Sequence, residues 1–445
     1  MDKFKSFVLE KKWLFIILFA AFALSIFYSF YYQIKPRVDA RAYDQIAQNI
    51  VAGNGFRDNS GGDIDLNSAI NRAGPAYEYF LAGIYRIFGH SYPAVWIIQA
   101  LLRALSALFL YLAALLIFDG SENKKKIALW AAAIFAFFPD LVEISAMLMT
   151  ETLYLFMISL VLYVFFLYFV KLKGHIAFLL GIAAGLAVLT RPPVLLLLPI
   201  MLFYPVFKRK FLHAGLFLIA LILVFLPWTV RNYKVYNEIM PFGAGGSMIF
   251  WIGNYHGSTG EQIPSAEQGA FYASHTVKES NDESISRFKS FVLNYPGEFA
   301  KLTLIRINKY FSVLRPMGFW FYNSGWKQIL FVLSSAIYSL LLFVLSFGGI
   351  LRSIKLKNMN VNYLLLFTLF TPLLIFITVV ETRYRFQIYP FLTLFAAYYI
   401  SLFEFDKRSW FKNLLVPSAV VLSNGIVDGL LNFNVFKDKI FSHFG

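Results

Sequence analysis

The sequence contains no cysteine and comparatively few charged residues. Charged side chains make up 15% of the 445 residues, whereas soluble domains carry about one quarter. Without cysteine there is no disulfide, no thiolate nucleophile and no cysteine-ligated metal. Neither a Walker A nor a His-Glu-x-x-His sequence is present, and the six histidines are scattered. Direct use of a nucleotide as an energy source is therefore disfavoured, and no metal cluster is evident.

The sequence is instead rich in long apolar runs. Hydrophobic residues make up 59% of the chain, and the mean hydropathy is +0.62. The runs recur from end to end, and most reach the length of about 18 residues or more that crosses a bilayer as a helix. Only helices and closed barrels can span a membrane, and continuous rather than alternating runs favour helices. The sequence therefore predicts an all-α polytopic membrane protein.

The net charge of +15 is distributed over the ends of these runs rather than in one patch. This distribution argues against nucleic-acid binding and fits the positive-inside bias of membrane proteins. Four lysines precede the first run at 13–34, which is too long for a signal peptide. We therefore expect an uncleaved first span with the N-terminus in the cytoplasm. Later inward ends carry basic residues too, at 124–126, 208–210, 352–357 and 407–412.

These runs predict about 10–11 transmembrane helices in the cytoplasmic (inner or plasma) membrane. We expect a transmembrane domain at 1–405, with exoplasmic loops at about 35–90 and 232–326. Short amphipathic helices are expected on the outer face at 39–51 and 75–88. The segment 406–445 is expected to form either an eleventh span or an interfacial helix, because Asn424 and Asp428 interrupt its apolar run.

Ionisable residues collect at the outer ends of five segments. Near the bilayer edge such groups mark either functional sites or snorkelling anchors, and a set that converges on one face favours function. The residues are Asp39 and Asp44, Arg72, Asp140 and Glu151, Arg191 and Arg231, and Glu381, Arg383 and Arg385. In the long outer loop, the aromatic, amide and imidazole groups of Asn254, Tyr255 and His256 are typical of sugar-binding surfaces and equally of interfacial loops.

These groups suit the transfer of a sugar that is carried on a lipid phosphate. The phosphate lies at headgroup level, where arginines can bind it and stabilise its charge as it leaves. A carboxylate on the opposite side of the anomeric carbon can deprotonate an incoming hydroxyl or amine, and attack from that side inverts the anomeric centre. We interpret Asp39, the first carboxylate after the first span, as this general base. No cofactor is certain, and a divalent cation held by Asp39 and Glu151 is left open.

Several short motifs follow one another in a fixed order. They are Asp39-x-x-x-Tyr43, Arg72-x-x-Pro75-x-Tyr77, Met149-Thr150-Glu151, Thr190-Arg191-Pro192, Pro227-Trp228-x-x-Arg231-Asn232 and Glu381-x-Arg383-Tyr384-Arg385. In this order, over about residues 13–405, the chain resembles the GT-C-fold glycosyltransferases that use polyprenyl-phosphate sugars. That superfamily includes the lipid A aminoarabinose transferases and the protein O-mannosyltransferases.

The resemblance implies a GT-C-like bundle with an outward-facing active site and Asp39 as its catalytic carboxylate. It implies that arginines bind the carrier phosphate: Arg72, Arg191, Arg231, Arg383 and Arg385. Where the family often has Asp-Glu, this chain has Asp39-Ala40, so Asp44 or Glu151 is expected as a supporting acid or metal ligand. Contacts to the sugar or acceptor are assigned to Tyr43, Tyr77, Asn254, Tyr255 and His256.

The predicted function is therefore an inverting hexosyl- or pentosyltransferase of the cell envelope. Its partners would be a polyprenyl-phosphate-linked sugar donor, membrane lipid, and a glycan, lipid or protein acceptor on the exoplasmic face, with no nucleic acid. Two alternatives remain: a ligase or polymerase of lipid-linked oligosaccharides, and a transporter or flippase of lipid-linked sugars. A transporter would more often place its polar residues at the membrane midplane, whereas this chain gathers charge at one rim.

Overall fold

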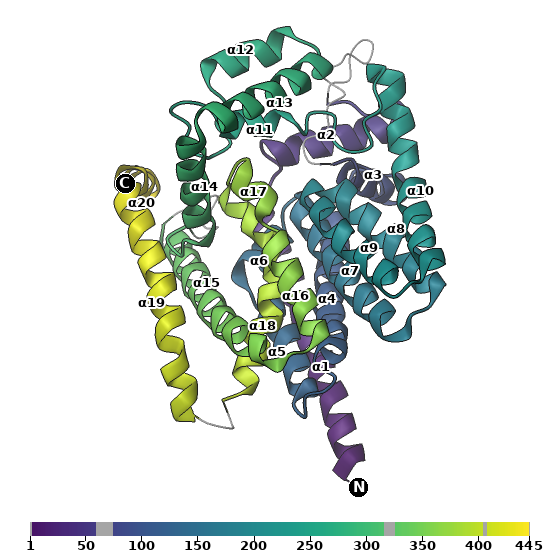
Figure 1. Cartoon of the computed structure of the whole chain (residues 1–445), viewed down its shortest axis with the longest axis vertical. Coiled ribbons are helices and arrows are strands. Elements are labelled where there is room, and N and C mark those ends of the chain that lie inside the picture. The colour runs from purple at the N-terminus through teal and green to yellow at the C-terminus, as the bar shows by residue number, and fades with distance from the viewer. Residues whose placement is uncertain (1, 59–73, 316–324, 404–406, 445) are drawn as a thin grey trace.

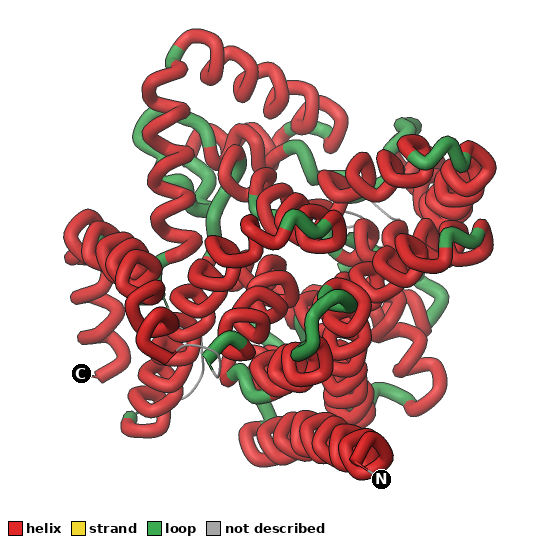
Figure 2. The backbone as a smooth tube through the Cα atoms, turned by 60° about the horizontal axis from the view of Figure 1, so that its bottom comes forward, coloured by secondary structure: helices red, strands yellow, loops and turns green. Residues whose placement is uncertain are grey.

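The computed structural model describes residues 2–58, 74–315, 325–403 and 407–444. Over these ranges the chain forms helices and one isolated parallel bridge, between Glu261 and Val380, and no strand (Figure 2). The apolar composition accounts for this, because a helix satisfies its backbone groups within its own segment. The predicted all-α fold is confirmed.

Seven membrane-crossing candidates stand out in the described part of the chain by length and apolar composition. They are α1 (Asp2–Tyr32), α4 (Tyr92–Ile117), α7 (Thr150–Lys171), α10 (Phe211–Tyr236), α15 (Trp326–Ser353), α16 (Met359–Phe370) continued by α17 (Leu373–Ile377), and α19 (Lys407–Leu431). Most of the spans expected from the sequence are therefore present as long helices.

The other expected spans are shorter apolar helices. They are α5 (Lys124–Ala136), α8 (Gly174–Thr190), η1 (Pro192–Leu197) with α9 (Leu198–Phe207), and η4 (Thr382–Ile388) with α18 (Tyr389–Ser401). Proline ends two of them, because it cannot continue a helix interior. Pro139 follows α5 and is the first residue of the short helix α6 (Pro139–Ile144), and Pro192 follows α8.

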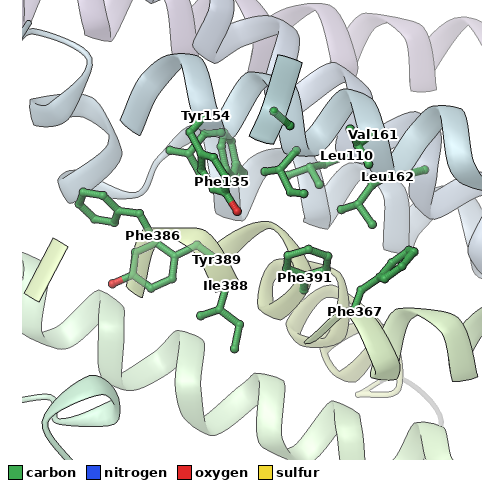
Figure 3. Packing of buried hydrophobic residues seen from close by; sticks show 14 of the residues in the cluster. Leu110, Phe135, Tyr154, Val161, Leu162, Phe367, Phe386, Ile388, Tyr389 and Phe391 are labelled. Carbon is green, nitrogen blue, oxygen red and sulfur yellow. The ribbon is translucent and has the colours of Figure 1, made fainter. Parts of the chain in front are cut away.

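The core lies where α4, α5 and α7 meet α16, η4 and α18. Figure 3 shows Phe135 and Tyr154 facing Phe386 and Tyr389 across this contact. Close approach of helices depends on small residues there, as is usual in membrane bundles. A Cβ atom on Gly349 of α15 would clash with the carbonyl group of Phe395 on α18. The glycine therefore lets these two helices touch along their backbones.

A layer of shorter helices covers the end of the bundle opposite the N-terminus, at the top of Figure 1. It contains α2 (Asp39–Val51), α3 (Ala76–Phe88), α11 (Met248–Gly253), α12 (Ala266–Ser274), α13 (Val277–Asn294) and α14 (Pro296–Phe311). Helix α2 has the bounds predicted from its 3.6-residue period, and it buries Tyr43, Ile46 and Ala47. Most of the region expected as a long polar loop is thus helical, and this layer positions the charged groups described below.

The last membrane candidate, α19, is followed by α20 (Phe433–Phe444). The two polar residues that weakened the prediction of a span are both paired in the structure. Asn424 accepts a hydrogen bond of 2.9 Å from Asn308 of α14, and Asp428 forms an ion pair with Arg315. The length and composition of α19 suit a span. Pairing of the two polar groups lowers the cost of placing them in the membrane.

Candidate active site

Asp39 and Arg383 are brought together from opposite ends of the sequence. Asp39 is the first residue of α2, directly after the first span, and Arg383 lies in η4. Nη2 of Arg383 donates to Oδ2 of Asp39 at 2.6 Å, and the two side chains are 12% and 22% exposed. A partly buried, charge-assisted bond of this length is a strong one. The predicted base and a predicted phosphate-binding arginine therefore lie in direct contact.

A second, deeper ion pair joins Glu151 to Arg191. Glu151 stands in the first turn of α7, where a negative charge is favoured by the helix dipole, and Arg191 directly follows α8. Nη1 of Arg191 donates to Oε1 of Glu151 at 2.6 Å, with 8% and 0% of the side chains exposed. A buried carboxylate of this kind requires a cation beside it.

Tyr384 links the two ion pairs. The guanidinium carbons of Arg191 and Arg383 lie 5.1 and 5.8 Å from the centroid of its ring, within the range of cation–π contact. Its hydroxyl donates to the side chain of Gln262. Burial lowers the pKa of Arg383, but the carboxylates of Glu151 and Asp39 outweigh this and hold that pKa above its ordinary value. We call Asp39, Arg383, Glu151, Arg191 and Tyr384 the ion-pair cluster.

Tyr43 and Tyr77 pack against each other beside the ion-pair cluster. Their rings meet edge to face, with centroids 5.5 Å apart, and both side chains are buried. Tyr43 interacts electrostatically with Asp39, Arg383 and Glu151. The structure thus brings two of the five residues predicted to contact sugar or acceptor to the same place as the predicted base.

Gln99 of α4 is a residue that the sequence analysis missed. The hydroxyl of Tyr77 donates to its Oε1 at 2.9 Å, and its Nε2 donates to the carbonyl oxygens of Ser145 and Met147, each at 2.9 Å. These carbonyls belong to the break between α6 and α7, where the helical ladder is interrupted. The Gln99 amide therefore fixes the segment that leads into Glu151. One glutamine in an apolar span was the available signal.

Asp44 lies on α2 but outside the ion-pair cluster. Its carboxylate accepts hydrogen bonds from Tyr85 at 2.6 Å, His90 at 2.9 Å, Tyr92 at 3.0 Å and Gln48 at 3.1 Å. These donors come from α2, α3, the turn after it and α4, so Asp44 fastens the outer helices to one another. The arginines of the cluster are paired with Asp39 and Glu151 instead.

Two other predicted arginines are held elsewhere. Arg231 stacks against Phe56 and Trp228, with its guanidinium carbon 5.2 and 4.7 Å from their ring centroids, and donates to the carbonyl of Phe56 at 3.1 Å. Arg385 points into the protein interior, where it donates to the carbonyl oxygens of Ser312 and Arg315. Arg72 lies outside the described residues.

The predicted contacts from the long outer region form hydrogen bonds with groups outside the cluster. Asn254 is buried and donates to the carbonyl oxygens of Phe250 and Ile377, at 2.8 and 3.0 Å. The Tyr255 hydroxyl reaches the carbonyl of Ile263 at 3.4 Å, and the exposed ring of His256 contacts Glu298 at 2.8 Å. These three side chains fasten the outer helices in the structure.

Glu78 is a second residue that the sequence analysis missed. It is fully buried in the first turn of α3, directly after Tyr77, and neither carboxylate oxygen has a hydrogen-bond partner among the other described residues. Burial raises the pKa of Glu78 to about 8, while a backbone hydrogen bond lowers it slightly. The Glu78 carboxyl is therefore buried beside Tyr43 and Tyr77, and it is neutral over much of the pH range.

The described residues contain no group of three or more histidine, aspartate or glutamate side chains that could hold a metal ion. The two acids considered for a divalent cation, Asp39 and Glu151, are each paired with an arginine. Positive guanidinium groups at hydrogen-bond distance disfavour a further cation on the same oxygens. These donors as arranged do not fit a divalent cation.

Comparison with known proteins gives one matching family model and several solved structures of similar fold. A family model described as dolichyl-phosphate-mannose-protein mannosyltransferase matches residues 72–230. No curated protein matches the sequence. The Archaeoglobus fulgidus oligosaccharyltransferase, in complex with zinc and sulfate, is similar with a TM-score of 0.53 and 16% identity, over 92% of this chain and 52% of that one.

Two further solved structures are similar over most of this chain. Oligosaccharyltransferase AglB from A. fulgidus, in complex with an inhibitory peptide and a dolichol-phosphate, has a TM-score of 0.53 and 15% identity, over 94% of this chain and 56% of that one. ArnT from Cupriavidus metallidurans in the apo state has a TM-score of 0.50 and 14% identity, over 97% and 65%. This chain thus spans about half to two thirds of the length of these structures. The likeness shows the fold, which is the predicted all-α, multi-pass, GT-C-like bundle.

Proposed function

We propose that this protein is an inverting membrane glycosyltransferase, which moves a sugar from a polyprenyl-phosphate carrier to a glycan, lipid or protein acceptor on the exoplasmic face. The observation that carries the proposal is the contact between Asp39 and Arg383 within a GT-C fold. Inversion needs a base and a phosphate-binding cation on opposite sides of one anomeric carbon, so this pair supplies both groups and must separate when the donor binds.

The reaction follows from these two groups. Asp39 takes the proton from an acceptor hydroxyl or amine, whose oxygen or nitrogen forms a bond to the anomeric carbon. The bond from that carbon to the carrier phosphate breaks, and the phosphate oxygen leaves with the electron pair. Arg383 and Arg191 stabilise the charge that grows on the phosphate. Attack from the side opposite the leaving group inverts the anomeric centre.

The ion pair also describes the resting state of the site. Before the donor arrives, Asp39 provides the negative charge beside Arg383. The phosphate of the donor is a diester with one negative charge, like the carboxylate, and its two free oxygens compete with Asp39 for the same guanidinium. As the phosphate binds, Asp39 loses part of its contact with Arg383 and becomes a better proton acceptor. Donor binding therefore activates the base.

The position of the cluster supports an exoplasmic site. Helix α2 and η4 lie near the end of the bundle opposite the N-terminus (Figure 1). The basic ends of the apolar runs favour a cytoplasmic N-terminus by the positive-inside rule. The fold and the lysines together therefore support an active site that faces out of the cell.

Binding of undecaprenyl phosphate to the full chain in nanodiscs tests the proposal. Arg383→Gln should raise the Kd for undecaprenyl phosphate by about tenfold or more, which corresponds to a loss of about 1.4 kcal/mol or more of binding free energy. Arg287→Gln is the matched control, because Arg287 is an exposed arginine of α13. An equal affinity of the Arg383→Gln and Arg287→Gln variants would contradict the assignment of Arg383 to the phosphate.

A further inference from the structure

We infer that Asp428 of the C-terminal helix α19 is a positioning residue for the ion-pair cluster, and that it acts through Arg315 and Glu261 on the segment that holds Tyr384. The inference rests on the proposed function, because it assigns a role in the same site. It gives a task to a helix that carries none of the family motifs.

The first step joins α19 to the outer layer. Arg315 follows α14 and binds Asp428 through two bonds, from Nε to Oδ2 at 2.7 Å and from Nη2 to Oδ1 at 2.9 Å. Asp428 is fully buried and Arg315 is 8% exposed. A two-point contact of this kind fixes the orientation of both groups.

The second step joins Arg315 to Glu261. Nη1 of Arg315 and Nζ of Lys309 both donate to Oε1 of Glu261 at 3.0 Å. Burial raises the pKa of Glu261, but the two cations outweigh this and hold that pKa below its ordinary value. Glu261 is therefore an anchored carboxylate, and its anchor depends on an arginine that Asp428 orients.

The third step joins Glu261 to Tyr384. The backbone of Glu261 lies alongside Val380 as a parallel bridge, and the Val380 amide donates to the carbonyl of Gly260 at 2.8 Å. The next residue, Gln262, accepts the hydrogen bond from the Tyr384 hydroxyl. The segment 260–262 thus holds the ring against which both cluster arginines stack.

A return contact closes the chain of interactions. Arg385, one residue after Tyr384, donates to the carbonyl oxygens of Ser312 and Arg315. The turn that carries Arg315 is therefore held both from η4 and from α19. In Figure 1, α19 stands beside α14 and α15 on one side of the bundle, where this turn lies.

A purely structural role for Asp428 predicts something different. In that case its loss would weaken the docking of α19 in general, as would the loss of any other polar contact of this helix. Asn424 lies one turn earlier and exchanges hydrogen bonds of 2.9 and 3.0 Å with Asn308 of α14. It contacts α14 but not Arg315 or Glu261, so Asn424→Leu is a matched control for Asp428→Asn.

Hydrogen exchange of the full chain in nanodiscs separates the two roles. Asp428→Asn should speed backbone exchange in peptides covering 254–265 and 378–388 by about tenfold relative to Asn424→Leu. It should also weaken binding of undecaprenyl phosphate relative to the control. Glu261→Gln removes the carboxylate that Arg315 binds on the other side and should give the same exchange pattern. This second variant keeps the test valid if Asp428→Asn folds poorly.

Equal exchange in these peptides for the Asp428→Asn and Asn424→Leu variants would overturn the inference. Faster exchange with unchanged binding of undecaprenyl phosphate would overturn the role of Asp428 in the site. If the unsubstituted protein does not bind undecaprenyl phosphate, the proposed function fails instead, and the exchange pattern still decides whether Asp428 positions the segment 260–262.

Discussion

Replacing Glu78 by glutamine should stabilise the protein, and more so as the pH rises. The carboxyl group is fully buried and has no hydrogen-bond partner among the other residues that the structure describes, and its pKa in the folded protein is about 8 against an ordinary value of 4.5. Below pH 4.5 the carboxyl is protonated in both the folded and the unfolded chain, so the folded state pays no ionisation penalty. Between about pH 4.5 and 8 the unfolded chain ionises while the folded chain stays neutral, and stability is lost.

The size of this loss follows from the pKa difference. Each unit corresponds to about 1.4 kcal/mol, so a difference of roughly 3.5 units destabilises the folded protein by up to roughly 5 kcal/mol above pH 8. Glutamine has the same shape and does not titrate. The apparent Tm of Glu78→Gln should therefore exceed that of the unsubstituted protein by a margin that grows over this pH range.

Thermal unfolding in detergent, followed by tryptophan fluorescence across this range, measures the effect. Glu283→Gln on α13 provides the control, because Glu283 is partly exposed and paired with Arg287. Parallel pH profiles for Glu78→Gln and the unsubstituted protein would refute the reasoning, since they would mean that Glu78 ionises freely in the folded state.

Other substitutions test the buried polar contacts of the site. Glu151→Gln leaves Arg191 as a buried unpaired cation and should cost about 3–5 kcal/mol of unfolding free energy. Adding Arg191→Leu to the same chain should restore part of this loss, and additive losses would contradict the pairing. Gln99→Leu removes the amide that bonds the Ser145 and Met147 carbonyl groups and the Tyr77 hydroxyl. It should cost about 1–3 kcal/mol of unfolding free energy, with a larger fall in transfer rate than in affinity for undecaprenyl phosphate. Asp44→Asn should lower the apparent Tm yet retain transfer, and loss of transfer at full stability would reassign the base.

Periodic and local features of the sequence predicted much of the fold. The bounds of α2 follow from apolar residues at helical spacing and from the Gly53-Asn54-Gly55 stop, and the structure has the same bounds. The apolar runs and the order of the motifs predicted the all-α membrane fold. Proline marks the places where expected spans became shorter helices, as at Pro139 and Pro192.

Contacts between distant segments were beyond the reach of the sequence. Asp39 and Arg383 are 344 residues apart, and no local pattern distinguishes Arg383, which faces the cluster, from Arg385, which faces the interior. The two are separated by one residue in a 3₁₀ helix and project in different directions, and tertiary packing decides which of them faces the cluster. Gln99 and Asp428 likewise acquire their roles only through tertiary contacts.

The most direct test of the account compares two properties of a single variant, Asp39→Asn. Transfer of sugar from an undecaprenyl-phosphate-linked sugar donor should fall by about 10²-fold or more, as expected for the loss of a general base. Affinity for undecaprenyl phosphate should be unchanged or higher, because the carboxylate that competes for Arg383 is gone. Transfer near the level of the unsubstituted protein would contradict the central claim that Asp39 is the base.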